Sequence, residues 1–342
     1  MGDGCYPRAP VKWPSKSCWW LAAAILLIVG GGAVLAVDKE TGDPPECVHE
    51  LRYVPFAGLI LVSVTIAESP PLDFVLDSGA TQSAITDPHL AAALALEMRE
   101  AGLARGMGSG ATRVLIAEHA SIRGDGQEIL RSPLVVHDIG GRLAAMAGRE
   151  IDGFLGADLF ERYVVEIDPE GRRLLLHDPA TFVYRGGGEI LPLEVVDRRP
   201  VIEGRVVVEA GKKPVPIRLV VDTGSSRYLT LITRSRRQLK PPTERTLGAS
   251  VGVVGETLVV IAPVDRLELG SLVIQRVETA WMEPFRIPAV RNIPKLNGII
   301  GNPLLSRYHV FFDYHHGRLI LEGTSDSPDT VHEISDGDSS SR

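Results

Sequence analysis

The sequence repeats itself at a separation of 145 positions, and this repeat restricts the possible folds more than any other feature. The segment FVLDSGA at 74–80 returns as LVVDTGS at 219–225. The alignment continues without a gap over about 90 positions, so the chain contains two copies of one structural unit. The other matched positions include Gly110 with Gly255, Thr112 with Thr257, Gly153 with Gly298, Gly156 with Gly301, Tyr163 with Tyr308, and Asp168 with Asp313.

Each copy has the same order of predicted elements. An apolar strand leads into the Asp-Ser/Thr-Gly turn, glycine-punctuated strands follow, and a strand pair closes the copy. Short apolar segments separated by Gly and Pro turns are typical of all-β barrels, and the chain has 35 Gly and 24 Pro. We therefore expect an all-β protein with two similar barrel lobes, residues 48–184 and 189–323, joined at a glycine-rich hinge.

One helix is predicted within this β-rich chain. Asp87 followed by Pro88 has the pattern of a helix cap and a first helical turn. The residues that follow, His89–Leu103, are rich in Ala and Leu. The pattern therefore predicts a helix over this stretch.

An uncharged apolar run lies near the N-terminus. Trp19–Val37 is close to the length of about 20 residues that spans a bilayer as a helix. Basic residues precede the run and acidic residues follow it, which places residues 1–18 in the cytoplasm and exports the rest. A small-residue cleavage site ending at Ala36 would instead make the run a secretory signal. The Ser- and Asp-rich stretch 324–342 is expected to be a disordered tail.

Charge and cysteine content exclude several classes of function. The net charge is −7 and no Lys/Arg block carries interleaved aromatic residues, so we expect no nucleic-acid partner. Of the three Cys, Cys47 is the only one that follows the apolar run. We therefore expect neither an intramolecular disulfide in the exported part nor a zinc cluster, and no metal or other cofactor.

The repeated Asp turn is the candidate site. A single Asp-Ser-Gly turn would be an ordinary surface turn. Here three apolar residues precede each Asp, so each carboxylate ends a buried strand, where an isolated charge is costly. Because the turn occurs once in each copy, a two-fold arrangement of the copies would bring Asp77 and Asp222 face to face.

Two carboxyl groups in contact have a defined chemistry. They share one proton, which separates their apparent pKa values. The ionised group can take a proton from a water that attacks an amide carbonyl, while the protonated group donates to the carbonyl oxygen. Ser225 has a hydroxyl at a position where the first turn has Ala80, so we expect Asp222 to be the more acidic partner.

The neighbouring residues fit this arrangement. Gly79 and Gly224 have no side chain and let the backbone approach the carboxyl groups. Ser78 and Thr223 each place a hydroxyl beside the aspartate, so we expect these hydroxyls to cross-link the two loops.

With these motifs the chain resembles a bilobed aspartic protease of the retropepsin/pepsin-like superfamily, and most resembles bacterial membrane-anchored members with retropepsin-like lobes. The resemblance covers residues 50–323 and rests on the turns 77–80 and 222–225 and on the apolar-Gly segments ending at Gly156 and Gly301.

The resemblance implies an aspartic endopeptidase. Asp77 and Asp222 would be catalytic, and Ser78, Gly79, Ala80, Thr223, Gly224 and Ser225 would support them. It implies a peptide or protein substrate and a monomer whose site forms within one chain. It also implies an inner-membrane protein, anchored by the apolar run, whose catalytic part is periplasmic or extracellular, or a secreted one if the run is cleaved.

The flaps depart from the pepsin pattern. Between Tyr53 and Tyr163 the sequence has no Tyr or Trp, so the flap Tyr of pepsin-like enzymes is missing. The candidate flaps, 105–112 and 250–257, are both glycine-rich and resemble the paired flaps of retropepsins. Their marker glycines are Gly108, Gly110, Gly252 and Gly255.

Two other interpretations stay open from the sequence. A catalytically silent peptide-binding or scaffold protein could keep the same bilobed fold. An exported β-rich domain with unrelated chemistry would instead hold Asp77 and Asp222 far apart.

Overall fold

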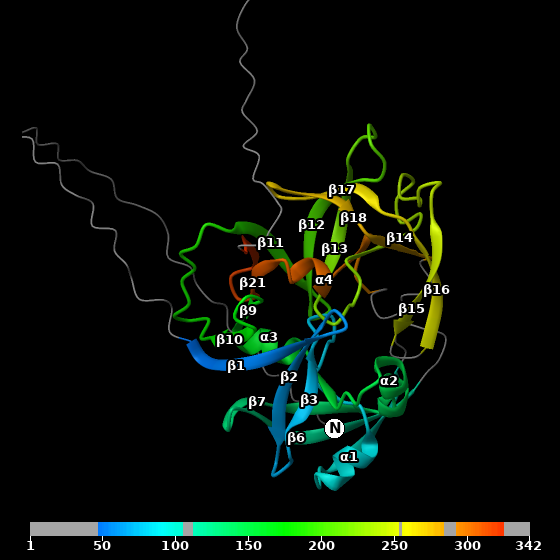
Figure 1. The fold of residues 1–342 in the computed structure, drawn as a ribbon. Coiled ribbons are helices and arrows are strands. Elements are labelled where there is room, and N and C mark those ends of the chain that lie inside the picture. Colours follow the sequence, from blue (N-terminus) through cyan, green and yellow to red (C-terminus); the bar gives the residue numbers. More distant parts are fainter. Residues whose placement is uncertain (1–46, 105–111, 253–254, 284–291, 325–342) are drawn as a thin grey trace, which may run out of the picture. The chain divides into compact units, whose positions relative to one another are not determined.

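The structure, a computed structural model, describes four stretches of the chain: residues 47–104, 112–252, 255–283 and 292–324 (Figure 1). The predicted cytoplasmic segment 1–18, the apolar run 19–37 and the tail from 325 onward lie outside the described residues. In the four stretches no helix combines the length and the apolar character needed to cross a membrane.

The described part of the chain is mostly β, as the sequence predicts. The elements of the first repeat are β1 (Cys47–Phe56), β2 (Leu59–Ile66), β3 (Leu72–Leu76), β4 (Ala84–Ile85), α1 (Pro88–Ala93), β5 (Met98–Ala104), β6 (Thr112–Gly124), β7 (Gln127–His137), α2 (Gly140–Ala147), β8 (Gly153–Leu155), α3 (Ala157–Arg162), β9 (Val164–Asp168) and β10 (Arg173–His177).

The second repeat has an equivalent series of strands. Its elements are β11 (Glu189–Val196), β12 (Arg199–Val207), β13 (Val215–Asp222), β14 (Leu229–Ile232), β15 (Thr246–Gly252), β16 (Gly255–Ile261), β17 (Val264–Leu269), β18 (Leu272–Val277), β19 (Thr279–Met282), β20 (Gly298–Gly301), α4 (Asn302–Leu305), β21 (Tyr308–Asp313) and β22 (Arg318–Gly323).

Six strands of the first repeat close into a ring. The order around the ring is β2, β3, β8, β4, β7 and β6, and β6 pairs back with β2. The β3–β8 and β4–β7 pairs are parallel, and the other pairs are antiparallel. A closed ring leaves none of these strands as a free edge.

The second repeat reproduces this pairing. β13 pairs in parallel with β20, β14 pairs antiparallel with β20, and β14 pairs in parallel with β19, as their equivalents do in the first repeat. The single strand β6 corresponds to two strands, β16 and β17, which are separated at Pro263. Proline has no N–H to donate to a ladder, so the strand is interrupted there. The first repeat has a register shift at the equivalent place, between Ala117 and Ala120.

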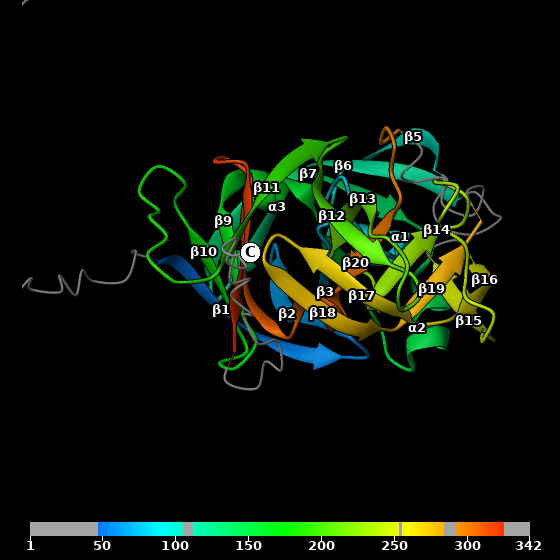
Figure 2. The same cartoon turned by 90° about the horizontal axis from the view of Figure 1, so that it is seen from above.

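Strands from both repeats share a third sheet. Its order is β1, β10, β9, β21, β22 and β11, and all of its pairs are antiparallel. Figure 2 shows β1, β9, β10 and β11 of this sheet together on the left. Val310 pairs with Ile167. Phe312, the repeat equivalent of Ile167, pairs with Val165, which is the equivalent of Val310. A two-fold relation between β9 and β21 produces this exchange of partners.

The apolar core crosses from one repeat to the other. Buried side chains of both repeats belong to one continuous cluster. At the junction, Phe160 of α3 meets Phe312 of β21 edge to face, with ring centroids 5.1 Å apart. This geometry is the favoured one for aromatic pairs and adds to the stabilisation from burial.

The predicted helix is only partly correct. It begins where expected, because the Asp87 side chain accepts a hydrogen bond from the His89 N–H and Pro88 occupies the first helical turn. It ends at Ala93, and Ala95 has a left-handed φ of 52°. Residues 98–103, predicted to be helical, belong instead to β5, which pairs with β6. Hairpin pairing overrides the helix propensity of this Ala- and Leu-rich stretch.

Candidate active site

The two repeated aspartates lie at the ends of equivalent strands. Asp222 is the last residue of β13, and Asp77 directly follows β3. The N–H of Asp77 donates to the carbonyl of Leu155 at 2.9 Å, which continues the parallel pairing of β3 with β8. The strand leading to each Asp is apolar and mostly buried, so burial of the strand places each carboxyl group at the equivalent position of its repeat.

The structure brings Asp77 and Asp222 into contact. Their carboxyl groups hydrogen-bond to each other, and both residues are partly buried. A Cβ added to Gly79 would lie 2.5 Å from Cγ of Asp222, and one added to Gly224 would lie 2.4 Å from Cγ of Asp77. Each loop therefore packs its glycine directly against the carboxyl group of the other loop, and a larger residue would clash. The arrangement with two distant aspartates is excluded by this geometry.

The hydroxyls of Ser78 and Thr223 cross-link the two loops, as expected. The Ser78 N–H donates to Thr223 Oγ1 at 2.9 Å, and the Thr223 N–H donates to Ser78 Oγ at 3.0 Å. Ser78 Oγ then donates to the carbonyl of Val221, and Thr223 Oγ1 to that of Leu76. Both side chains are completely buried. These reciprocal hydrogen bonds fix the distance between the two loops.

Burial dominates the electrostatics of the pair. It raises the pKa of Asp77, and the hydrogen bonds from Asp222, Gly79 and Ala80 oppose that rise. Burial also raises the pKa of Asp222 well above its ordinary value, and here the charge of Asp77 adds to the rise. The geometry therefore favours an ionised Asp77 and a protonated Asp222.

This assignment corrects the prediction that Asp222 is the more acidic partner. Oδ1 of Asp77 accepts two backbone N–H groups, from Gly79 at 2.9 Å and from Ala80 at 3.0 Å. Oδ1 of Asp222 accepts one, from Gly224 at 2.9 Å. In the described stretches the Ser225 hydroxyl makes no hydrogen bond to Asp222, and it lies 2.9 Å from the position that a Cβ on Gly301 would take. The Ser225 hydroxyl is visible in the sequence, whereas the backbone N–H donors are not.

The apolar-Gly segments hold the two loops from behind. The Ala157 N–H donates to the carbonyl of Ala80 at 3.0 Å, and in the second repeat the Asn302 N–H donates to the carbonyl of Ser225 at 2.9 Å. The glycine before each donor is required by space. A Cβ on Gly156 would lie 2.5 Å from the backbone of Gln82.

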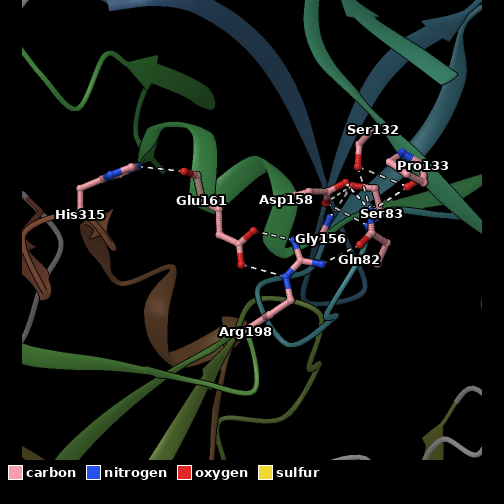
Figure 3. Close-up of polar contacts among 9 residues, drawn as sticks. All are labelled: Gln82, Ser83, Ser132, Pro133, Gly156, Asp158, Glu161, Arg198 and His315. Atoms are coloured by element: carbon pink, nitrogen blue, oxygen red, sulfur yellow. Dashed lines mark hydrogen bonds and ion pairs between the residues drawn. The ribbon is translucent and has the colours of Figure 1, made fainter. Parts of the chain in front are cut away.

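A buried carboxylate in the first repeat was not predicted from the sequence. Asp158 accepts hydrogen bonds from the N–H and the hydroxyl of Ser83, at 2.9 Å and 2.6 Å (Figure 3). The Ser83 hydroxyl in turn accepts the N–H of Gly156 at 2.9 Å. The second repeat has Pro303 in place of Asp158. The one sequence sign of this buried carboxylate is that the aligned repeats have different residues at this position.

Two arginines of the β11–β12 hairpin also reach the first repeat: Arg198 in the turn and Arg199 at the start of β12. Arg198 bridges the Glu161 carboxylate and the Gln82 side chain, as Figure 3 shows. Arg199 donates from Nε to the carbonyl of Gly79 at 2.7 Å and from Nη1 to Asp197 Oδ2 at 2.7 Å. Sequence reasoning missed both, because a turn at the surface gives no sign that its side chains enter the other repeat.

The candidate flaps fall on hairpins. β5 pairs with β6 and β15 pairs with β16, and Gly252 and Gly255 form the last pair of the second hairpin. Gly108 and Gly110 lie outside the described residues. The role of these hairpins as flaps stays a prediction.

The carboxyl groups of the site do not form part of a metal-binding cluster. Across the described stretches, no group of three or more His, Cys, Asp or Glu side chains is arranged to hold a metal ion. The two aspartate carboxyl groups hydrogen-bond to each other, so they can hold a proton between them.

Comparison with known proteins bears on the first repeat. Residues 62–159 match the family model described as aspartyl protease, which supports an aspartic protease family. The matched stretch contains Asp77 and the segment ending at Gly156, and the second repeat lies beyond it. No curated protein matches the chain.

Proposed function

We propose that the protein is an aspartic endopeptidase built from two retropepsin-like lobes, with Asp77 and Asp222 as its catalytic residues. One observation carries the proposal: two carboxyl groups at the ends of equivalent buried strands hydrogen-bond to each other. A buried carboxyl pair that holds one proton between them is the arrangement required for acid–base hydrolysis of an amide. The family match over the first repeat supports it.

The proposed reaction uses both protonation states of the pair. The Asp77 carboxylate takes a proton from a water, whose oxygen bonds to the carbonyl carbon of the substrate. Asp222 gives its proton to the carbonyl oxygen, which forms a tetrahedral diol. The C–N bond then breaks, the proton on Asp77 passes to the leaving nitrogen, and a hydroxyl proton of the diol returns to Asp222. The pair ends in its starting state.

The substrate would be a peptide or protein segment lying over the pair. The β5–β6 and β15–β16 hairpins are the proposed flaps above it, one from each repeat. One chain supplies both aspartates, so the protein would act as a monomer. We propose that residues 19–37 anchor it in the inner membrane with the catalytic part on the periplasmic or extracellular side, or act as a cleaved export signal.

A peptide-library digest tests this function. We expect the full chain in detergent to cleave peptides between about pH 4 and 7, because the pair must be singly ionised. Asp77→Asn should abolish cleavage, while the control Asp125→Asn, in an exposed turn, should cleave normally. Peptide binding without cleavage would favour the silent scaffold, and cleavage that survives Asp77→Asn would overturn the proposal.

A further inference from the structure

Most contacts around the two carboxyl groups are duplicated. The Ala80 N–H bond to Asp77 is not, and neither is the contact made by one charged side chain. The hydroxyl cross-links, the glycine contacts and the backbone bonds from behind all occur once per repeat. Arg199 has no counterpart. It pairs with Val196 at the end of the β11–β12 hairpin, and the equivalent place in the β1–β2 hairpin, opposite Phe56, is Leu59. A single guanidinium therefore makes the charge around the site asymmetric.

Arg199 is held tightly beside the pair. Its residue surface is only 7% exposed. Nε donates to the Gly79 carbonyl at 2.7 Å, and Gly79 is the residue packed against the Asp222 carboxyl group. Nη1 donates to Asp197 through Oδ2 at 2.7 Å and through the backbone carbonyl at 3.3 Å. A buried guanidinium with several fixed acceptors keeps one orientation, so its charge acts from one defined place.

The partner of Arg199 does not cancel this charge. The Asp197 side chain is 39% exposed, against 9% for Arg199. Water screens the Asp197 carboxylate, whereas the guanidinium lies in the protein interior, where its field is stronger. The interior therefore retains a net positive bias next to the two carboxyl groups.

We propose that Arg199 is a positioning residue of the Asp77/Asp222 pair: it holds the Gly79 carbonyl in place, and its positive charge keeps the pair singly ionised at more acidic pH than the pair would be alone. The inference rests on the proposed function, because the singly ionised pair is the reactive form. It adds a charge that sets the working pH range.

The other charged and titratable groups near the pair do not supply this effect. Arg198 is paired with Glu161 of α3, and Asp158 of α3 accepts from Ser83. Burial raises the pKa of Tyr314, in the β21–β22 turn, well above 10, so its phenol stays neutral in the working range.

The Arg199 charge lowers the pKa of both Asp77 and Asp222, which is the direction that the geometry requires.

Two substitutions separate the charge from the hydrogen bond. Arg199→Gln keeps an N–H donor for the Gly79 carbonyl but removes the charge, and Arg199→Lys keeps the charge. We expect both limbs of the pH profile of kcat/KM to move upward by about one pH unit in Arg199→Gln. Arg199→Lys should keep a profile close to that of the unsubstituted chain. Arg205→Gln, at an exposed salt bridge, is the control and should not move it.

A third variant tests the direction in which the pH profile moves. Asp197→Asn removes the partner carboxylate, so the guanidinium acts on the pair with less compensation. Both limbs should then move downward, which no loss of stability would produce. Unmoved limbs in Arg199→Gln, or equal shifts in Arg199→Gln and Arg199→Lys, would overturn the inference. Should Arg199→Gln fail to fold, unmoved or rising limbs in Asp197→Asn would overturn it.

A titration that needs no activity distinguishes this inference from the proposed function. The carboxyl carbons of 13C-labelled Asp77 and Asp222 can be followed by NMR in the full chain, with each Asp→Asn variant assigning one signal. We expect the apparent pKa values of the two aspartates to rise in Arg199→Gln by the same amount as the limbs of the pH profile. A shift in a chain that cleaves nothing would leave this inference standing and remove the proposed function. If the unsubstituted chain cleaves peptides but the aspartate pKa values do not shift in Arg199→Gln, this inference is overturned and the proposed function stands.

Discussion

Hydroxyls and glycines at four positions decide whether the two aspartates meet. Ser78 and Thr223 are fully buried, and each hydroxyl both accepts an N–H and donates to a carbonyl of the other loop. Gly79 and Gly224 leave room for the carboxyl groups of the opposite loop. The site thus depends on the hydroxyl groups of Ser78 and Thr223 and on the absence of a side chain at Gly79 and Gly224.

Removing the Thr223 hydroxyl should destabilise the fold. Thr223→Val keeps the shape but leaves the Ser78 N–H and the Leu76 carbonyl without their partner. We expect a loss of about 1–3 kcal/mol in the free energy of unfolding, measured by urea denaturation. Thr243→Val, at an exposed position, is the control. Equal stability of the two variants would contradict the cross-link.

Adding one methyl group at Gly79 should separate the carboxyl groups. The new Cβ would lie 2.5 Å from Cγ of Asp222, so one of the loops must move. A displacement of this kind should reduce kcat/KM by about 100-fold or more in Gly79→Ala. Gly141→Ala, where a Cβ meets nothing within 4 Å, is the matched control. Gly79→Ala activity within threefold of the control would refute the tight packing.

Among the elements, the shared sheet contains a carboxylate held between two histidines. Glu166 of β9 contacts Nε2 of His177 in β10 at 2.5 Å and Nε2 of His309 in β21 at 2.7 Å. Burial opposes ionisation of Glu166, yet the hydrogen bonds from the two histidines lower its pKa to about 2. Burial likewise opposes the charge on His309, and the bond to Glu166 nevertheless raises its pKa. The bridge connects strands of the two repeats.

This bridge predicts a pH window of stability. The His309 contribution is complete below its unfolded pKa of 6.5 and is lost as pH rises through the higher folded pKa. The Glu166 contribution is complete above its unfolded pKa of 4.5 and is lost as pH falls toward 2. His309→Gln should therefore lose most stability between pH 4.5 and 6.5, by about 1.5–3 kcal/mol.

Urea denaturation across this range checks the window. His119→Gln, at an exposed position in β6, is the control and should differ little from the unsubstituted chain at any pH. A His309→Gln deficit that stays constant up to alkaline pH would show that packing, rather than the charged bridge, stabilises the junction.

The sequence allowed some elements to be predicted and not others. The repeat and its apolar strands indicated the β architecture, and the Asp87 cap indicated the start of α1. The end of α1 could not be read, because Met98–Ala104 is rich in helix-forming residues and becomes a strand only through its pairing with β6. Local propensity does not contain that long-range contact.

For the whole molecule, the repeat predicted the contact between Asp77 and Asp222 because it implied two-fold symmetry. It could not predict features that break the symmetry. Arg199 and Asp158 stand where the other repeat has an apolar residue or a proline, and an alignment of the repeats treats such positions as mere differences. The sequence also does not show the backbone N–H donors that favour ionisation of Asp77 over Asp222.

A site made within one chain predicts that complementation fails. If two chains each supplied one aspartate, mixing Asp77→Asn with Asp222→Asn would regenerate some intact sites. Because β9 and β21 of the same chain pair directly, we expect the mixture to be as inactive as either variant alone. Recovery of cleavage that grows with protein concentration would indicate that chains exchange their repeats.

The central claim is that Asp77 and Asp222 act as one catalytic unit, and a double-substitution comparison of kcat/KM tests it most directly. Residues that act as a unit have strongly non-additive effects. Asp77→Asn, Asp222→Asn and the double variant should therefore all fall to the same residual activity, about 1,000-fold or more below the unsubstituted chain. Substantial activity in either single variant, or losses that multiply in the double variant, would contradict the claim.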